Sequence, residues 1–489
     1  MRPVSAAVTT AAMWAVAACA GPVAEGARPA PAAMPAADTS AVVSLIRAAA
    51  RPITGSERDY DTLIAMVGDA RFVLLGDATH GTSEFYTERA RITRRLIEEK
   101  GFTAVAIEGD WPWAERVHQH VHGAGGDPGA AEALGGFLSD FPQWMWGSAE
   151  VAELVTWLRG WNQRAPHAAR VGFYGLDVYT LYPSAQAVER YLAGADTAAA
   201  ARARQRYRCF AAFGHDPQRY GAAAAVDPRR SCAAQARQVR EELEQRYSAL
   251  PAAGGDPAAA DALFSALRNA RVVENAEEYF RTLYEGGTST WNLRDQHMAE
   301  GLEQLGLHLA RQGKPPRVVV WAHNTHAGDA RVTQQGAAGE LNLGHLMRER
   351  YDGAAFLVGF TTYTGTVLAA SEWGEAGRVR NVRPALPESF AGLFHRSGVG
   401  NFLLPLRGTG SLADALAAPR LERAIGVLYL PETERASHYF LTRLSRQFDV
   451  VVHIDTTRAV RPLPAGTTAA RGETFDGMNG IRASAPRAP

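Results

Sequence analysis

Short apolar runs that stop at an ionisable residue are the main pattern along this chain of 489 residues. The runs are rich in Val, Ile, Leu and Phe and are mostly bounded by Gly, which is typical of buried parallel strands. Helical stretches alternate with them, so the pattern predicts an α/β fold with a mostly parallel central sheet flanked by helices. The four runs are residues 72–75, 104–107, 171–176 and 318–321.

Other segments extend this prediction. Three further apolar runs, at 356–360, 425–430 and 450–454, predict more strands. Residues 83–100 contain neither Pro nor Gly and precede a Gly, as expected for a helix with a glycine stop. Between 185 and 285 the composition favours helices without strands, so we expect a helical lobe inserted beside a deep cleft.

The first residues have the pattern of an export signal. Arg2 precedes an apolar stretch that is too short to span a bilayer, as in a signal peptide over residues 1–19. The stretch ends in Val-Ala-Ala-Cys19, which resembles a bacterial lipobox and predicts a lipid anchor on Cys19 at the membrane surface. The alternative is ordinary cleavage at a nearby site. In either case we expect export to the bacterial cell envelope or periplasm.

The rest of the chain divides by composition. Residues 20–38 are mostly Ala, Pro and Gly, which predicts a flexible linker, and 465–489 predict a disordered tail after a folded domain over 39–464. In an exported protein Cys209 and Cys232 are candidates for a disulfide, and the alternative is two unpaired thiols. Lys+Arg and Asp+Glu both number 51, so no basic excess points to a nucleic acid partner.

The strand ends carry the candidate chemistry. In an open α/β sheet, ligands bind outside the carboxyl ends of the strands, so the residues that follow the four runs are expected to meet. Asp77 and His80 follow the first run. An imidazole suits proton transfer near neutral pH, and a carboxylate three residues earlier would orient it. The alternative is a capping Asp and a surface His in a turn.

Arg89 is predicted to lie within an apolar helix face, because Phe85, Ile92 and Leu96 share its side of the helix. A guanidinium in that position needs a carboxylate, a substrate or a developing oxyanion as its partner. The alternative is an arginine at the edge of the stripe that reaches out to solvent.

The second run ends at Glu108, whose carboxylate needs Arg89 or a histidine as partner. Trp111 and Trp113 follow it closely. They are candidates for an apolar wall that binds a bulky substrate, although packing of the next helix explains a tryptophan equally well.

The fourth run is followed by His323 and His326. Two imidazoles within four residues are suited to donate to an oxyanion or to bind a metal. Asp177 follows the third run and is a candidate for holding a histidine in one tautomer. Arg294 opens a later helix and is expected to brace the cleft or contact the substrate.

Several common catalytic motifs do not occur in the sequence. There is no Gly-x-Ser-x-Gly elbow in a strand–turn–helix setting, no Walker A motif and no convincing dinucleotide fingerprint. A His-Glu-x-x-His zinc helix does not occur either. The sequence therefore gives no support to a common serine hydrolase, a nucleotide-binding enzyme or a zincin.

Together these segments resemble the erythromycin esterase family. The resemblance is carried by residues 74–86, by the helix with Arg89 and by residues 106–112 and 321–326, and it extends over most of 40–463. It implies an α/β fold with a deep cleft beside a helical lobe. It also implies a metal-independent esterase that opens macrolide lactones with an activated water and without a covalent intermediate.

Carried onto this chain, the resemblance implies that His80 is the general base and Glu108 its acidic partner in the cleft. Arg89, His323 and His326 match the polar cluster around the scissile group.

One position departs from the family pattern, which usually has Glu where this chain has Asp77, a carboxylate that is shorter by one methylene. We expect a hydrolase of a macrolide-like ester or lactone that needs no cofactor, with antibiotic resistance as a candidate role. One alternative is a metal-dependent hydrolase built from the same histidines and carboxylates. Another is a ligand-binding envelope protein in which Asp77 marks weakened catalysis.

Overall fold

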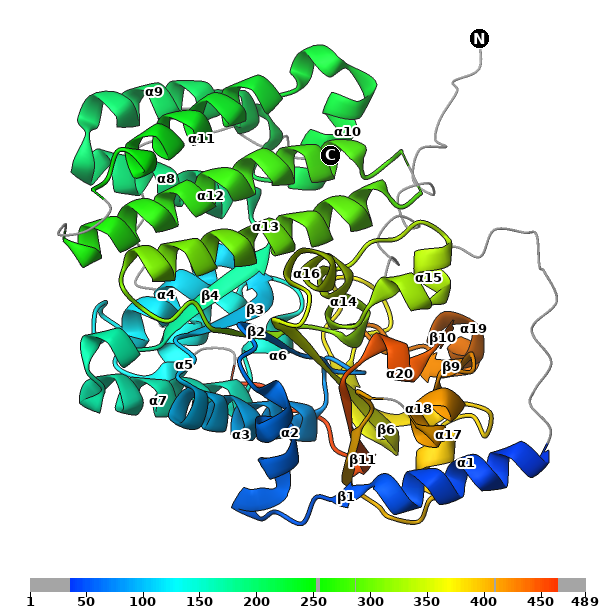
Figure 1. Ribbon diagram of the computed structural model, residues 1–489. Helices are drawn as coiled ribbons and strands as arrows, with labels where there is room; N and C mark the ends of the chain where they lie inside the picture. The colour runs from blue at the N-terminus through cyan, green and yellow to red at the C-terminus, as the bar shows by residue number, and fades with distance from the viewer. Residues whose placement is uncertain (1–35, 252–255, 286, 409, 465–489) are drawn as a thin grey trace, which may run out of the picture.

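Nine strands form the central sheet in the described part of the computed structural model, which comprises residues 36–251, 256–285, 287–408 and 410–464 (Figure 1). The order across the sheet is β1 (Arg51–Pro52), β8 (Phe402–Pro405), β11 (Val450–Thr457), β6 (Ala355–Ala369), β2 (Phe72–Leu75), β5 (Val318–Trp321), β3 (Ala104–Asp110) and β4 (Gly172–Asp177). β7 (Arg378–Val382) pairs with β6 outside this path. A separate pair consists of β9 (Arg420–Arg423) and β10 (Tyr439–Thr442).

The strands from β11 to β4 run parallel, and β1, β7 and β8 add antiparallel pairings. The prediction of a mostly parallel sheet flanked by helices is therefore confirmed. The predicted strand at 425–430 is wrong, because this segment makes isolated bridges instead. Ile425 pairs with Thr79 in the turn after β2, and Leu428 pairs with Ala370. The segment supports a turn rather than extending the sheet.

Helices cover both faces of the sheet, since the strand side chains alternate between two hydrophobic cores. Val73 and Leu75 point into a core with α2, α3 and α7, and Phe72 and Leu74 point into a second core with α1, α13, α16 and α17. The helices around the sheet are α1 (Ala36–Ala49), α2 (Asp61–Val67), α3 (Ser83–Lys100), α4 (Trp111–Val121), α5 (Ala130–Ala133), α6 (Gln143–Trp146), α7 (Ala149–Arg164), α14 (Asn324–Ala327), α15 (Gln334–Ala337), α16 (Leu343–Tyr351), α17 (Phe390–Arg396), α18 (Ser411–Leu416), α19 (Glu434–Ser437) and α20 (Leu444–Gln447).

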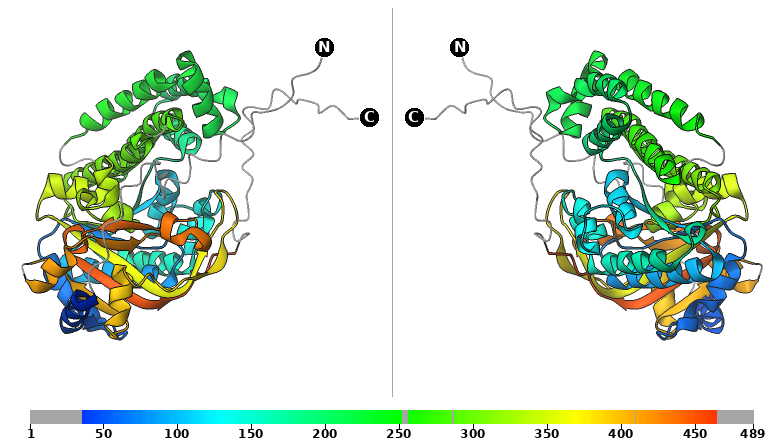
Figure 2. Two further views of the ribbon diagram at one scale, coloured as in Figure 1. Left: turned by 90° about the vertical axis from the view of Figure 1, so that its right-hand side faces the viewer. Right: turned by 90° about the vertical axis from the view of Figure 1, so that its left-hand side faces the viewer.

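A block of helices lies over one end of the sheet, between β4 and β5 in the chain (Figures 1 and 2). It has a third hydrophobic core of its own. A disulfide joins Cys209 to Cys232 within it, with the two Cα atoms 6.0 Å apart. The helices are α8 (Leu181–Ala195), α9 (Thr197–Tyr207), α10 (Pro217–Val226), α11 (Ala233–Ser248), α12 (Pro257–Thr282) and α13 (Ser289–Arg311).

Short 3-10 turns join these elements. They are η1 (Glu57–Tyr60), η2 (Leu134–Leu138), η3 (His167–Ala169), η4 (Arg208–Phe213), η5 (Pro228–Arg230), η6 (Ala330–Val332) and η7 (Pro431–Thr433). The expected signal peptide, including Cys19, and the expected tail lie outside the described residues. Within the described ranges, no helix has the length and apolarity needed to cross a membrane.

Candidate functional site

Four neighbouring parallel strands bring the candidate residues to one edge of the sheet. β2, β5, β3 and β4 are adjacent in that order, and their carboxyl ends lead into the turns or residues that carry the chemistry. The side chains at these ends are almost completely buried, with exposed fractions between 0% and 4%. They are Asp77 and His80 after β2, His323 and His326 after β5, Glu108 in β3 and Asp177 at the end of β4.

The turns after β2 and β5 are tied to each other. The backbone N–H of Asn324 donates to the carbonyl of Asp77 at 2.7 Å. Its side-chain amide bonds to both the N–H and the carbonyl of Phe360 in β6. This approach requires a glycine at position 76, because a Cβ there would overlap the Asn324 side chain. The spacing between His80 and His323 is thus set by backbone contacts.

His80 lies between two carboxylates. Its Nδ1 is 3.4 Å from Oδ1 of Asp77, and its Nε2 is 3.8 Å from Oε1 of Glu108. The hydroxyl of Tyr86 donates to the carbonyl of His80 at 2.7 Å and fixes the backbone of the turn. The ring of His323 lies 4.9 Å from the His80 ring, centroid to centroid. The imidazole is therefore held in a buried, acidic setting that suits a general base.

Arg89, on α3, contacts the carboxylate of Asp77. Its Nη1 is 2.9 Å from Oδ2 of Asp77, and its guanidinium lies over the rings of Tyr86 and Trp321. Burial opposes ionisation of Asp77, but the charges of His80 and Arg89 outweigh it and keep the pKa of Asp77 below its usual value. Arg89 has an exposed fraction of 0%, so its position fits charge balance of Asp77 better than the expected contact with an oxyanion.

Arg294, at the start of α13, is the cation at the centre of the cluster. Its Nε and Nη2 donate to the two oxygens of Asp177 at 2.8 and 2.6 Å, and Nη2 also donates to Glu108 at 2.8 Å. Nη1 lies 2.8 Å from Nε2 of His326. Asp177 therefore orients Arg294, whereas the sequence analysis assigned it to a histidine. Burial disfavours the ionised form of Glu108, yet His326, His80 and Arg294 hold the pKa of Glu108 well below its usual range.

His326 is held between two acidic groups. Its Nδ1 is 2.9 Å from both oxygens of Asp295, and its Nε2 is 3.3 Å from Oε1 of Glu108. Burial opposes a charged imidazole here, but Asp295 and Glu108 overcome it and raise the pKa of His326 to about 9. Nε2 accepts from Arg294 in the neutral form and donates to Glu108 in the protonated form. The ring is stacked on Trp291 at 4.4 Å.

His323 has a different environment. Its backbone N–H donates to Oε2 of Glu108 at 2.7 Å, and its Nδ1 pairs with the hydroxyl of Thr325 at 2.8 Å. Its buried Nε2 has no hydrogen-bond partner among the described residues. Burial and the neighbouring His80 lower the pKa of His323 to about 4. It is therefore a neutral imidazole at neutral pH, with one nitrogen left for a ligand or a water.

The two candidate tryptophans do not point into this cluster. The indole of Trp111 donates to Ser265 at 2.9 Å and packs against Tyr174 and Phe264 in the core under α12. The indole of Trp113 donates to Asp140 on the other side of α4. Their assignment to a substrate wall is corrected accordingly, since α4 turns both rings away from the end of β3.

Three neighbours of the cluster were given no role in the site by the sequence analysis. Trp291 stacks on His326, and the ring of Tyr179 lies 5.0 Å from the guanidinium of Arg294. Asp110 accepts the N–H groups of Tyr179 and Thr180, and burial together with Asp177 raises its pKa to about 8. Their positions beside the cluster depend on the folded structure, so the sequence alone does not predict them.

The arrangement of the histidines and carboxylates in the cluster does not suit a metal site, because several of them contact Arg294 instead. Within the described ranges, no group of three or more His, Cys, Asp or Glu is arranged to hold a metal ion. The guanidinium of Arg294 lies between Glu108, Asp177 and His326, where a cation would have to sit. A fixed arginine supplies the positive charge at this edge of the sheet.

Solved structures share this fold. One named as a succinoglycan biosynthesis protein has a TM-score of 0.72 and 23% identity, and covers 88% of this chain and 100% of its own. A protein from Bacillus cereus has a TM-score of 0.71 and 21% identity, with 87% and 99% covered. A mutant of erythromycin esterase EreC in its open conformation has a TM-score of 0.56 and 17% identity, with 84% and 96% covered. At these identities the likeness concerns the fold alone.

Sequence comparison identifies the family. A curated relative, erythromycin esterase type II of Escherichia coli, is 31% identical over 120 residues, which are 24% of this chain and 26% of the relative. The matched part thus spans about a quarter of that protein. The family model for erythromycin esterase matches residues 97–457, from the end of α3 to the end of β11. With most of its length matched by this model, the chain belongs to the erythromycin esterase family.

Proposed function

We propose that this protein hydrolyses a carboxylic ester or lactone by direct attack of a water activated by His80. The observation that carries the proposal is the placement of the His80 ring between Asp77 and Glu108, 3.4 and 3.8 Å away, with His323 facing it. An imidazole so placed takes a proton from water while the carboxylates stabilise its charged form. Membership of the erythromycin esterase family supports the same reaction class.

The other groups have separate roles in this proposal. The Nε2 of His323, which has no partner among the described residues, is suited to donate a hydrogen bond to a tetrahedral oxyanion. The protonated His326, whose Nε2 donates to Glu108, is suited to stabilise the same oxyanion through its positive charge. A single donor of this kind contributes about 3 kcal/mol to stabilising the transition state. Arg294 fixes Glu108 and His326, and Arg89 balances the charge of Asp77. No step requires a covalent enzyme intermediate.

The test is turnover of a macrolide and of simple lactones and aryl esters, followed by mass spectrometry for the gain of one water. The His80→Ala protein should lose at least a hundredfold in kcat, since a positioned general base contributes about 10²–10⁴-fold. His215→Asn is the matched control, because His215 is an exposed histidine in the helical lobe. Wild-type rates in His80→Ala would refute the proposal, as would binding of a macrolide without any product.

We also propose that the macrolide-like substrate is met outside the cytoplasm, with antibiotic resistance as the role. The disulfide between Cys209 and Cys232 supports export, since such bonds persist in oxidising compartments. The test is fractionation of cells that express the full chain, with Cys19→Ala as the variant. Retention of the wild type in the cytoplasm would refute export. Unchanged macrolide susceptibility of exporting cells would refute resistance.

A further inference from the structure

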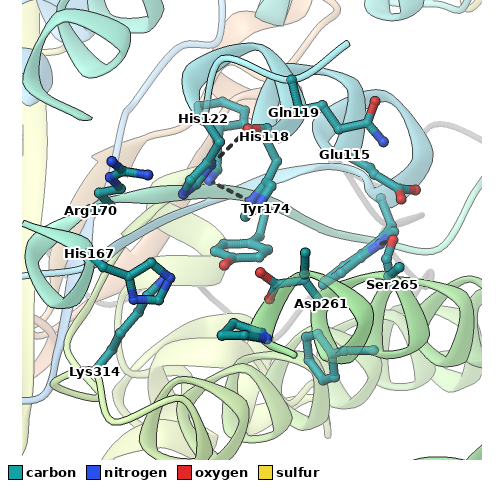
Figure 3. A pocket seen from close by; sticks show the side chains of 17 residues that line it. Glu115, His118, Gln119, His122, His167, Arg170, Tyr174, Asp261, Ser265 and Lys314 are labelled. Atoms are coloured by element: carbon teal, nitrogen blue, oxygen red, sulfur yellow. Dashed lines mark hydrogen bonds between the residues drawn. The ribbon is translucent and has the colours of Figure 1, made fainter. Parts of the chain in front are cut away.

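A cavity lies at the amino ends of β4 and β5, whereas the histidine cluster lies at the carboxyl ends of these strands. It has a volume of about 300 Å³ and is enclosed by α4, the first turns of α12, the segment before β4 and Lys314 before β5 (Figure 3). Cavities of this size hold small organic ligands. Tyr174 of β4 lines the cavity, and the three residues of extended strand from Tyr174 to Asp177 span about 10 Å.

Lys314 gives this cavity a cation that has no ion-pair partner among the described residues. The chain has only two lysines, Lys100 and Lys314, against 49 arginines out of 51 basic residues. The side chain of Lys314 lines the cavity with an exposed fraction of 5%, and among the described residues it forms no ion pair with a carboxylate. Lysines are almost never buried without a partner. An anion that enters the cavity would supply the missing one.

The acidic groups of the cavity do not fill this role. Asp261 accepts hydrogen bonds from His308 and Gln312 through the same oxygen, so it is already engaged with α13. Glu115 lies toward the far end, near Asn269 of α12, and burial raises the pKa of Glu115. Burial lowers the pKa of Lys314 and the charge of Asp261 opposes this shift from a distance, but among the described residues neither carboxylate forms an ion pair with the ammonium.

Two further polar groups face the same space. The hydroxyl of Tyr174 is buried and has no hydrogen-bond partner within the described chain. Burial raises the pKa of Tyr174 well above its usual value, so the hydroxyl keeps its proton and is a donor. Arg170 also lines the cavity and, in the described ranges, makes no ion pair with a carboxylate. A lysine and an arginine without a carboxylate partner and a phenol without an acceptor, all within the described residues, together form an anion-binding set.

The walls are flat and aromatic. The rings of Trp111 and Tyr174 lie 5.8 Å apart, and Phe264 packs on the other side of Trp111 at 5.7 Å. His118 and His122 are stacked at 4.3 Å along α4, and burial lowers the pKa of both, so they present neutral rings. Such walls favour a planar ligand over a small inorganic anion.

From these contacts we propose that the cavity binds a small aromatic carboxylate of about the size of benzoate. The carboxylate pairs with the ammonium of Lys314 and accepts from the hydroxyl of Tyr174, and the ring packs between the aromatic side chains. Arg170, which also lines the cavity, attracts the anion. This binding site is separate from the histidine cluster, and the proposal does not depend on the esterase reaction.

The first experiment is calorimetric titration of the full protein with benzoate, 4-hydroxybenzoate, benzamide, acetate and inorganic phosphate. Benzoate and its hydroxy analogue should bind, and the other three should bind at least tenfold more weakly. Lys314→Met keeps the length of the stem and removes the charge, so it should weaken benzoate binding at least tenfold, and Tyr174→Phe should weaken it several-fold. Lys100→Met is the matched control and should bind as the wild type does.

The second experiment needs no variant and therefore does not depend on its folding. Reductive methylation of the native protein modifies lysine side chains, and peptide mass spectrometry separates Lys100 from Lys314. Benzoate should slow methylation of Lys314 and leave Lys100 unchanged. The proposal is overturned if no aromatic acid binds, if Lys314→Met binds benzoate as tightly as the wild type, or if phosphate or acetate competes equally. Equal protection of both lysines would also overturn it.

Discussion

Glu108 holds His323 through the backbone: the N–H of His323 donates to Oε2 of Glu108 at 2.7 Å, while Oε1 accepts from Arg294 at 2.8 Å. One carboxylate therefore connects the end of β3 to the turn after β5 and to the start of α13. The same group lies 3.8 Å from Nε2 of His80. Removing its charge is thus expected to act on orientation and electrostatics together.

Glu108→Gln tests this relationship. The amide keeps the size of the side chain but replaces a charged acceptor, so Arg294 loses one of its two carboxylate partners and His80 loses a negative neighbour. Because a misplacement of about 1 Å can cost a hundredfold in rate, kcat should fall at least a hundredfold. Steady-state kinetics on an aryl ester measure the effect, and thermal unfolding checks the fold. A change below threefold would show that Glu108 has only a structural role.

Variants of Asp77 test whether an aspartate, where the family usually has a glutamate, lowers the catalytic rate. Its carboxylate reaches both His80, at 3.4 Å, and Arg89, at 2.9 Å, so the shorter side chain still makes both contacts. Asp77→Glu adds a methylene at a residue with an exposed fraction of 1%, which should cost about 1–3 kcal/mol of unfolding free energy without raising kcat. Asp77→Asn should lower kcat at least a hundredfold and leave Arg89 without a counter-ion. A tenfold gain in kcat for Asp77→Glu would instead favour a catalytically weakened protein.

The main strands were predictable because their information is local. The runs that form β2, β3, β4 and β5 are apolar on both faces and mostly bounded by Gly, and the rule for parallel sheets then places their carboxyl ends together. The residues that follow these runs, such as His80 and His323, were found for that reason. The segment at 425–430 has the same composition but pairs with the turn at Thr79, a long-range contact that no local pattern reveals.

The partners within the cluster were less predictable, because they depend on how α13 crosses the sheet edge. Arg294 and Asp295 are consecutive, yet one contacts Asp177 and Glu108 while the other contacts His326. Helices α8 to α12 separate α13 from β4 along the chain, so local spacing carries no information on these contacts. The apolar character of Trp111 was recognised, but its direction depends on the packing of α4 against α12.

Stability should decrease as the pH rises from 6.5 to 9. The folded pKa of His326 is about 9, above its usual value near 6.5, so its contribution is complete below 6.5 and is lost on the way to 9, on the order of 3 kcal/mol in total. Asp110 acts in the same direction up to pH 8, since its pKa is raised to about 8 and its contribution is lost progressively as the pH rises toward that value. Urea unfolding at several pH values measures the slope.

Asp110→Asn separates the two contributions. The amide stays neutral and keeps an oxygen that accepts from Tyr179 and Thr180, so the variant should lose less stability than the wild type between pH 6.5 and 8. Above pH 8 the two slopes should match, because His326 is unchanged. A variant whose slope equals that of the wild type throughout would show that Asp110 is already ionised in the folded protein.

Trp111 should affect stability rather than substrate affinity. Its side chain has an exposed fraction of 3% and packs against Tyr174 and Phe264, so Trp111→Ala should cost about 3–5 kcal/mol of unfolding free energy. Trp111→Phe keeps most of the contact and should leave KM for an ester within twofold of the wild type. A large rise in KM of Trp111→Phe with unchanged stability would show that Trp111 contacts the substrate.

The disulfide gives a prediction for the helical block alone. Cys209 and Cys232 are 23 residues apart, and closing a loop of that length stabilises a fold by about 3 kcal/mol in the chain-entropy model. The Cys209→Ser/Cys232→Ser double variant should therefore lose about this much, or show earlier melting of the helical block, while kcat stays unchanged because neither residue contacts the histidine cluster. Dithiothreitol should lower the stability of the wild type to that of the variant and have no effect on the variant itself. If titration with a thiol reagent under denaturing conditions finds that Cys209 and Cys232 are free thiols in the wild type, the bond does not form and these cysteines give no support to export.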